Sequence, residues 1–185
     1  MINSSYLTQE QSSPQTRLKD FMLVLGVSLL IGLFAQISIP LPFTPVPLIV
    51  YSQVILMLSV ILGSQRALAA VCLFLIEGAL GLPVFSGGTA GFARLLSPVG
   101  GYLIGFAAAA FVTGWIAERL KQKTKMALFT SMAIGNLIIF ALGVLWLSTF
   151  LGWTGAVLCG FIPFVIGDIL KLSVATVFLS RYFSK

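Results

Sequence analysis

Long apolar runs, separated by short polar or proline-rich segments, make up most of this chain. A helix needs about 20 predominantly apolar residues to cross the hydrocarbon core of a bilayer. The run "FMLVLGVSLLIGLFAQISI", 21–39, reaches that length on its own. The whole pattern predicts an all-α, polytopic membrane protein with six transmembrane helices, at roughly 21–39, 48–63, 66–81, 99–117, 127–149 and 163–181.

The breaks between these runs carry the usual helix-ending residues. "PLPFTPVP", 40–47, contains four prolines and predicts a stiff loop, because proline cannot occupy a helix interior. The glycine-rich stretch 84–101 predicts a long connection. "GWTGAVLCGFI", 152–162, fits either a short helix or a loop, and Pro163 suits the first turn of the last helix. The predicted helices at 48–63 and 66–81 are short for a full crossing. They either cross a thin part of the bilayer or are sheltered from lipid by neighbouring helices.

Composition supports the membrane assignment. Hydrophobic residues make up 58% of the chain and charged residues 9%, whereas soluble domains average about a quarter charged residues. The 185 residues predict one transmembrane domain, 21–185, after a polar cytoplasmic tail, 1–20. The chain has no histidine, which argues against most metal sites, and we interpret Cys72 and Cys159 as small buried hydrophobes.

The basic residues predict the orientation. With six crossings, one side of the membrane carries Arg17, Lys19, Arg66, Arg119, Lys121, Lys123, Lys125, Arg181 and Lys185. The other side carries only Arg94. The positive-inside rule then places both termini in the cytoplasm. The net charge of +6 therefore reflects topology in a lipid bilayer and not nucleic-acid binding.

Asp168 and Lys171 lie in the middle of the apolar stretch "PFVIGDILKLSVA", 163–175. An ionisable group inside a membrane costs from about 3 kcal/mol upward, so it needs a partner or water. Their i,i+3 spacing places both on one helix face. If the last helix starts at Pro163 on the outer side, both lie in its first two turns and therefore in the outer third of the membrane. We expect them to face a cavity and hold a polar ligand. The alternative is a buried ion pair that only fixes helix packing.

Three further residues are candidates for the same site. Glu77 is a second buried acid that could neighbour Lys171 or Arg94, or be a solvated carboxylate at the rim. Arg94 follows the glycine-rich "GGTAG" and would attract an anionic ligand group. Tyr102 offers an amphipathic ring at the same level, or is a plain interfacial aromatic. "GGTAG" lacks the lysine of a phosphate-binding loop, so nucleotide binding is not expected.

Two functional classes remain open on the residues alone, and a third is disfavoured. The chain could capture a small polar ligand, or it could be a proton-coupled permease acting alone with Glu77 and Asp168 as proton sites. An intramembrane hydrolase needs a nucleophile with a base, paired acids or a metal. Ser173 cannot face Lys171 at i,i+2 spacing, so we predict no catalytic residues and no enzyme.

Three blocks of the sequence resemble a known family. They are "QISIPLPFTPVP", 36–47, "GLPVFSGGTAGFARLLSPVGGYLIGF", 81–106, and "PFVIGDILK", 163–171. They resemble, in the family order, the BioY family of biotin-specific S components of energy-coupling-factor (ECF) transporters. The resemblance covers residues 21–183.

The resemblance implies a six-helix fold with a biotin pocket near the outer face, capped by the two loops at 40–47 and 84–101. Asp168 and Lys171 match the family's acid and base and would bind the polar ring system of biotin. Arg94 could serve the valerate carboxylate. The resemblance also implies a transmembrane coupling subunit and two ATPase subunits as partners. The chain itself would then need no cofactor, because the partners use ATP, and it would deliver biotin inward.

The chain departs from the family pattern at three positions that the resemblance places in the pocket. Tyr51 stands where the family has a glutamine. Val99 replaces the threonine of the Gly-Pro-Thr segment, which reads Ser97-Pro98-Val99 here. Glu77 does not belong to the pattern. We therefore include Tyr51 and Glu77 among the expected substrate-binding residues.

Overall fold

The computed structural model describes residues 14–184 and is built almost entirely of helices. The long helices are α2 (Pro14–Ala35), α3 (Tyr51–Leu62), α4 (Ser64–Ala79), α6 (Gly100–Arg119), α7 (Lys125–Gly160) and α8 (Ile162–Phe183). Two short turns, η1 (Ser86–Gly88) and α5 (Ala93–Leu96), lie between α4 and α6. The proline-rich loop forms a small antiparallel hairpin, β1 (Ser38–Ile39) with β2 (Leu48–Ile49), in which Ser38 lies opposite Ile49. The helical class is as the sequence predicts.

Four of the described helices are long and apolar enough to cross a membrane, namely α2 (from Gln15), α6, α7 and α8. The other two, α3 with 12 residues and α4 with 16, are shorter. Large apolar side chains cover the outside of the bundle. Leu137, Ile166 and Val174 are 63%, 75% and 71% exposed. Such an extensive exposed apolar surface is typical of a protein surrounded by lipid.

Several boundaries differ from the sequence prediction. The predicted first helix, 21–39, ends at Ala35, and Ser38–Ile39 form strand β1 instead. The first helix begins at Pro14, inside the segment predicted as a polar tail, because proline suits a helix start and Asp20 pairs with Arg66 of α4 at 2.8 Å. Residues 1–13 of that tail lie outside the described part of the chain, as does Lys185. The ambiguous segment 152–162 is helical up to Gly160, after an interruption at Gly152, where φ is 71°.

A single glycine makes the turn between α3 and α4. Gly63 has φ 82° and ψ 174°, a backbone conformation that side chains disfavour. The carboxylate of Glu118, near the end of α6, accepts hydrogen bonds from the Ser64 backbone N–H at 2.6 Å and from the Ser64 hydroxyl at 3.0 Å. A carboxylate at a helix N-terminus accepts hydrogen bonds from the free N–H groups of the first turn and interacts favourably with the positive end of the helix dipole. The start of α4 is thus attached to the end of α6.

Small residues bring α6 and α7 close together. A Cβ on Gly105 of α6 would come within 3.1 Å of the Ile139 Cα on α7. On α7, a Cβ on Gly143 would overlap the Tyr102 ring. Without a hydrophobic driving force between helices in lipid, such close approach is a principal source of packing energy. These contacts set how α7 is rotated relative to α6.

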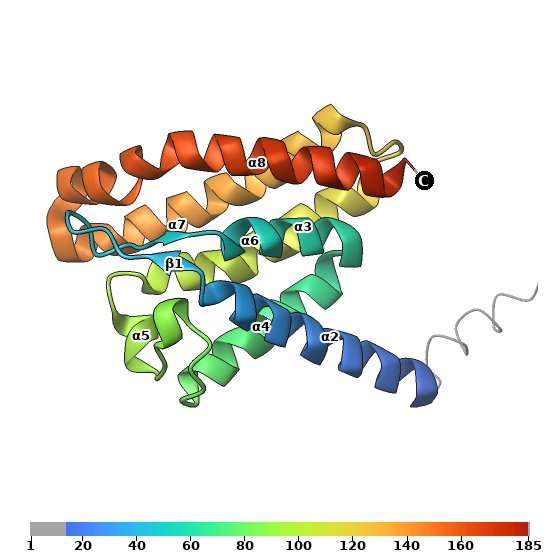
Figure 1. Ribbon diagram of the computed structural model, residues 1–185, viewed down its shortest axis with the longest axis horizontal. Helices are drawn as coiled ribbons and strands as arrows, with labels where there is room; N and C mark the ends of the chain where they lie inside the picture. The colour runs from blue at the N-terminus through green and yellow to red at the C-terminus, as the bar shows by residue number, and fades with distance from the viewer. Residues whose placement is uncertain (1–13, 185) are drawn as a thin grey trace, which may run out of the picture.

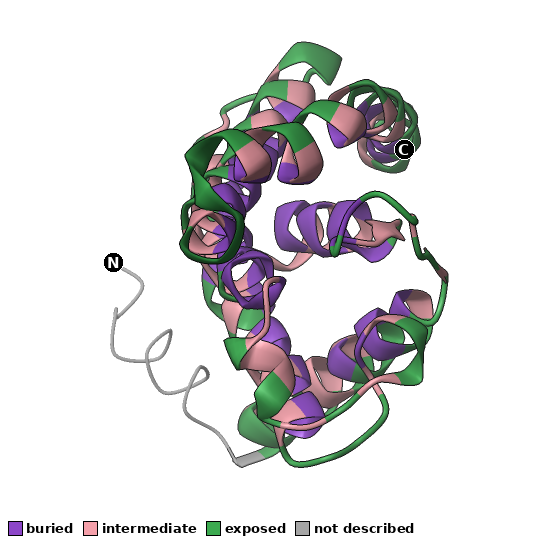
Figure 2. Cartoon of the chain, turned by 90° about the vertical axis from the view of Figure 1, so that its left-hand side faces the viewer, coloured by how far each residue is buried: buried purple, intermediate pink, exposed green. Residues whose placement is uncertain are grey.

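The connections gather at the two ends of the bundle. Figure 1 shows the β1–β2 hairpin, α5 and the α7–α8 junction at one end, and the α3–α4 turn, the α6–α7 loop and the C-terminus at the other. Figure 2 shows buried residues on the helix faces that point toward one another and exposed residues on the outer faces. Cys72 and Cys159 are unpaired and half-buried.

Candidate functional site

A cavity lies among α3, α6, α7 and α8, near the hairpin end of the bundle. Its walls are mostly apolar and come from helices far apart in sequence: Val99, Leu103, Phe106, Ile139, Phe140 and Phe164. The loop residues Pro47 and Phe85 also line it. A mostly apolar cavity with a few placed polar groups is the usual form of a small-molecule site.

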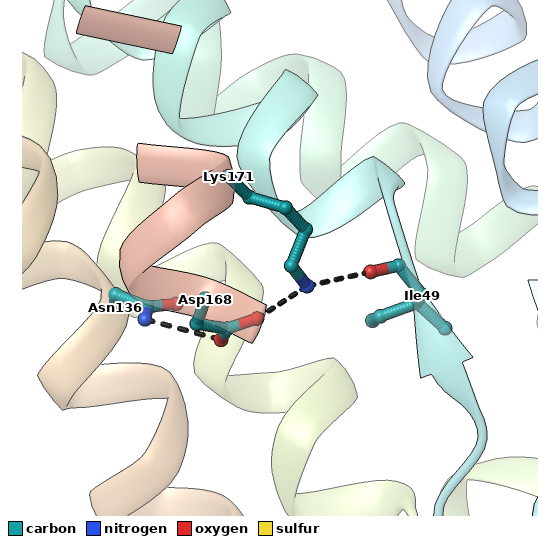
Figure 3. A network of polar contacts seen from close by, with 4 residues as sticks. All are labelled: Ile49, Asn136, Asp168 and Lys171. Carbon is teal, nitrogen blue, oxygen red and sulfur yellow. Dashed lines mark hydrogen bonds and ion pairs between the residues drawn. The ribbon is translucent and has the colours of Figure 1, made fainter. Parts of the chain in front are cut away.

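Asp168 and Lys171 of α8 form an ion pair on the cavity wall, as their spacing predicts. Each of the two charged groups also makes a hydrogen bond to a further residue (Figure 3). The Lys171 Nζ also donates to the Ile49 backbone carbonyl at 2.9 Å, and the Asn136 Nδ2 donates to the Asp168 Oδ2 at 3.1 Å. Asp168 is only 7% exposed, so its charge depends on these partners. The pair is thus held in place and remains at the cavity surface.

The hydrogen bond from Lys171 to Ile49 joins two parts of the site. Ile49 ends strand β2, directly before α3 begins, and it lines the cavity itself. The hydroxyl of Thr44, at the hairpin tip, donates to the Cys159 carbonyl at 2.7 Å. The hairpin is therefore anchored both to α8 and to the end of α7, and it covers one side of the cavity.

Tyr51, Ser52, Ser86 and Arg94 supply further polar groups of the cavity. Tyr51 is 2% exposed, and its ring meets the Phe106 ring edge-on with centroids 5.2 Å apart. The Ser86 hydroxyl donates to the Tyr51 hydroxyl oxygen at 3.2 Å. Arg94, on α5, is half-buried. The structure thus brings Tyr51 and Arg94 to the same cavity as the ion pair.

A second hollow adjoins the cavity on the loop side. It is formed by the hairpin and the η1 region, and Pro47, Ser86 and Arg94 line both spaces. Its other lining residues include Ser38, Thr44 and Thr89. The two spaces therefore share part of their walls at the hairpin end of the bundle, between the two loops.

Tyr102 lines the cavity, but its hydroxyl is already engaged. It donates to the Gly160 carbonyl, at the end of α7, at 2.8 Å. At 6% exposed, Tyr102 is a buried wall residue and not an interfacial aromatic. It presents its ring to the cavity and attaches α6 to α7.

The structure places Glu77 apart from these groups. Its carboxylate accepts a hydrogen bond from the Ser28 hydroxyl of α2 at 2.6 Å. Glu77 is 8% exposed and is not among the residues that line the cavity. Neither Arg94 nor Lys171 is among its described polar contacts, so the expected neighbourhood is not found. The reason is rotational: the face of α4 that carries Glu77 packs against α2.

Asn136 is one of the polar site residues that sequence reasoning missed, together with Ser52 and Ser86. It lies on α7, is 6% exposed and lines the cavity beside Asp168. The signal was present as an amide inside the apolar run 127–149. It was not predicted as a site residue because a neutral amide in an apolar run is a weaker signal than an ionisable group.

Comparison with known proteins decides the family. The sequence model of the BioY family matches residues 8–185. The chain belongs to the BioY family. The resemblance carried by the three sequence blocks is therefore confirmed.

Curated members of the BioY family resemble the chain over most of its length. The probable biotin transporter BioY of Pyrococcus horikoshii is 33% identical over 163 residues, which cover 88% of this chain and 95% of that protein. The biotin transporter BioY of Rhizobium etli is 39% identical over 154 residues, covering 78% and 81%. A crystal structure of the S-component for biotin from an ECF-type ABC transporter superposes with a TM-score of 0.83 at 25% identity, covering 94% of this chain and 95% of that one.

The BioY family assignment settles the class of protein. Its members are named as transporters, which confirms that the chain is not an enzyme. Together with the apolar helices, it makes the chain a multi-pass membrane protein with the S-component fold.

Proposed function

We propose that this chain captures biotin in an outward-facing pocket within the membrane and delivers it inward, as the S component of an ECF-type uptake transporter. The observation that carries this proposal is the Asp168–Lys171 pair on the wall of an otherwise apolar cavity. The names of its BioY relatives supply the ligand.

The chemistry of the site suits the ureido ring of biotin. That ring has one carbonyl acceptor and two N–H donors. Lys171 uses one N–H on Ile49 and another on Asp168, which leaves a third to donate to the carbonyl. Each oxygen of the Asp168 carboxylate has a further lone pair to accept an N–H. The apolar walls suit the fused thioether ring and the methylenes of the side chain.

Arg94 is suited to the valerate carboxylate. It lines both the cavity and the adjoining hollow, so a side chain leading from the buried ring toward the loops would pass it. Within residues 14–184 no ion pair engages its guanidinium. Tyr51 and Tyr102 then act as aromatic walls of the same pocket.

The proposal extends to topology and partners. Six crossings, with α3 and α4 sheltered by their neighbours, leave both termini in the cytoplasm of a bacterial cell and the transmembrane domain at 21–185, after a cytoplasmic segment. The alternating ends of the connections in Figure 1 support this arrangement. The partners are a transmembrane coupling subunit and two ATPase subunits, which use ATP, while the chain itself carries no cofactor.

The contacts of Glu77 bear on the alternative of a proton-coupled permease acting alone. That mechanism needs Glu77 and Asp168 to exchange protons with a common path. Glu77 instead bonds to Ser28 and lies off the cavity, while Asp168 is neutralised by Lys171. Uptake that survived ATP depletion but collapsed with the proton gradient would restore this alternative.

Calorimetric titration of the purified, detergent-solubilised chain with biotin tests the proposal directly. We expect tight one-to-one binding of biotin, weaker binding of desthiobiotin and none of thiamine. Thiamine lacks the cyclic urea that the ion pair would recognise. A monodisperse sample that does not bind biotin would refute the ligand while leaving the fold in place.

A further inference from the structure

A cluster of basic residues surrounds the α6–α7 loop, at the end of the bundle opposite the hairpin (Figure 1). It consists of Arg119 at the end of α6, Lys121 and Lys123 in the loop, and Lys125 at the start of α7, and we call it the basic end. The Lys123 Nζ lies 3.8 Å from the centroid of the Phe183 ring, so the end of α8 packs against the same loop. Segments from three helices therefore build this surface.

No ion pair within residues 14–184 involves the basic end. Glu118, which directly precedes Arg119, accepts hydrogen bonds from Ser64 at the start of α4. The other three described acids also have partners on other elements. Arg181, in the last turn of α8, adds a further positive charge to this end of the bundle. The described part of the chain thus supplies no counter-charge for the basic end.

Aromatic rings hold two of these cations in place. The guanidinium carbon of Arg119 lies 3.7 Å from the centroid of the Trp115 ring, and one of its nitrogens donates to the Trp115 carbonyl at 3.1 Å. A guanidinium has five N–H groups, so the others remain free to donate. Lys123 lies over the Phe183 ring in the same manner. Cations that are ordered in advance lose less freedom when they bind an anion.

Apolar side chains border the basic end. Trp115, Met126 and Tyr182 are 44%, 76% and 55% exposed. Trp and Tyr are enriched where apolar helices reach the headgroup level of a bilayer. Trp115 and Arg119 lie four residues apart, so they share one face of α6. A ligand of this surface therefore meets donors and positive charge directly beside an apolar, lipid-facing side chain.

We propose that the basic end binds an anionic phospholipid. Arg119 binds its phosphate, Lys123 supplies a second positive charge, and an acyl chain lies against the exposed part of Trp115. Guanidinium groups bind phosphate oxygens through charge-assisted hydrogen bonds, which are stronger than neutral ones. None of the four cations lines the cavity, so the site is separate from the proposed biotin pocket.

Native mass spectrometry of the purified full-length chain measures the affinity of the first bound lipid. The titration compares phosphatidylglycerol, which is anionic, with phosphatidylcholine of the same acyl chains, which has no net charge. We expect phosphatidylglycerol to bind roughly 10- to 30-fold more tightly, because each of two basic residues contributes about 5-fold at an anionic headgroup. Inorganic phosphate, added at matched ionic strength, should not displace it, because free phosphate leaves Trp115 uncovered.

Two double variants with the same loss of charge separate a site from a diffuse positive field. Arg119→Gln/Lys123→Gln should reduce the preference for phosphatidylglycerol to below about 3-fold. Arg17→Gln/Lys19→Gln is the matched control, because both residues are exposed on α2, whose start lies away from the end of α8 (Figure 1). The control should keep the wild-type preference. Equal reductions in the two variants would mean that only net charge matters, and the inference would be wrong.

The other outcomes of this experiment are also decisive. Equal binding of both lipids by the wild type, or displacement of phosphatidylglycerol by inorganic phosphate, would overturn the proposal. If Arg119→Gln/Lys123→Gln does not fold, Lys123→Gln in the loop takes its place. It should lower the preference about 5-fold, and an unchanged preference would count against the site.

Biotin titration separates this inference from the proposed function. Both double variants should bind biotin within about 3-fold of the wild type, since none of the four substituted residues lines the cavity. A wild-type chain that prefers phosphatidylglycerol but does not bind biotin would refute the proposed function and leave the lipid site standing.

Discussion

Two acids are buried among residues 14–184, the described part of this membrane protein, and their surroundings differ. Asp168 is 7% exposed and Glu77 is 8% exposed, so burial alone does not distinguish them. Asp168 meets a cation and an amide on the wall of a cavity, while Glu77 meets a serine hydroxyl where α2 packs against α4. Both acids have a polar partner, so the difference lies in the cavity and the counter-charge, which only Asp168 has.

The largest expected effect comes from neutralising each of the two acids in turn. Asp168→Asn leaves the half-buried Lys171 ammonium without its counter-charge and replaces one acceptor oxygen of the carboxylate with an N–H donor. We expect biotin affinity to fall by about 100-fold or more in calorimetric titration. Glu77→Gln retains a carbonyl oxygen for Ser28 and should bind biotin within about 3-fold of the wild type. Equal losses in the two variants would make the contrast between the acids wrong.

The same contrast can be tested with two arginines, one at the cavity and one on the outside of the bundle. Arg94 lines the cavity, whereas Arg66 pairs with Asp20 at 2.8 Å on the outside of the bundle. Arg94→Ala should weaken biotin about 10-fold by removing a charge-assisted contact, and should leave biotinamide, which has no carboxylate, almost unaffected. Arg66→Ala is the control and should change neither ligand, because exposed ion pairs contribute about 0–1 kcal/mol. If Arg94→Ala weakened both ligands equally, its partner would not be the carboxylate.

The smallest effect concerns Glu77 and its partner. Ser28→Ala removes the hydroxyl that donates to the Glu77 carboxylate at 2.6 Å. Leaving that buried acceptor unpaired should lower stability by about 1–3 kcal/mol. A lower thermal unfolding midpoint in detergent, with biotin affinity unchanged, is the expected result. A variant that lost affinity but not stability would place Glu77 in the binding machinery after all.

Part of the site could be predicted from the sequence because it is local. Asp168 and Lys171 lie three residues apart, so any helix through them places both on one face. Their other partners could not be predicted in this way. The contact with Ile49 joins residues 122 positions apart, and the contact with Asn136 joins residues 32 apart. Such contacts depend on how separate helices are set against one another.

Helix boundaries show the same division. Pro163 and the proline-rich loop mark the start of α8 and the hairpin because proline restricts its own backbone. The start of α4 at Ser64 is different, since Glu118 of α6 holds it, a residue 54 positions away. The ion pair between Asp20 and Arg66 of α4 is a second contact between separate helices that no local pattern reveals.

By itself, the sequence determined the class of protein, the approximate helices, the BioY family and the acid–base pair, because apolar run length, proline and i,i+3 spacing act within one segment. Only the tertiary structure decided which acid faces the cavity, that the Tyr102 hydroxyl is spent on Gly160, and that Asn136 stands beside Asp168. The physical reason is the rotation of each helix about its axis. That rotation is set by close packing across glycines such as Gly105 and Gly143, which is a property of pairs of helices and not of either one alone.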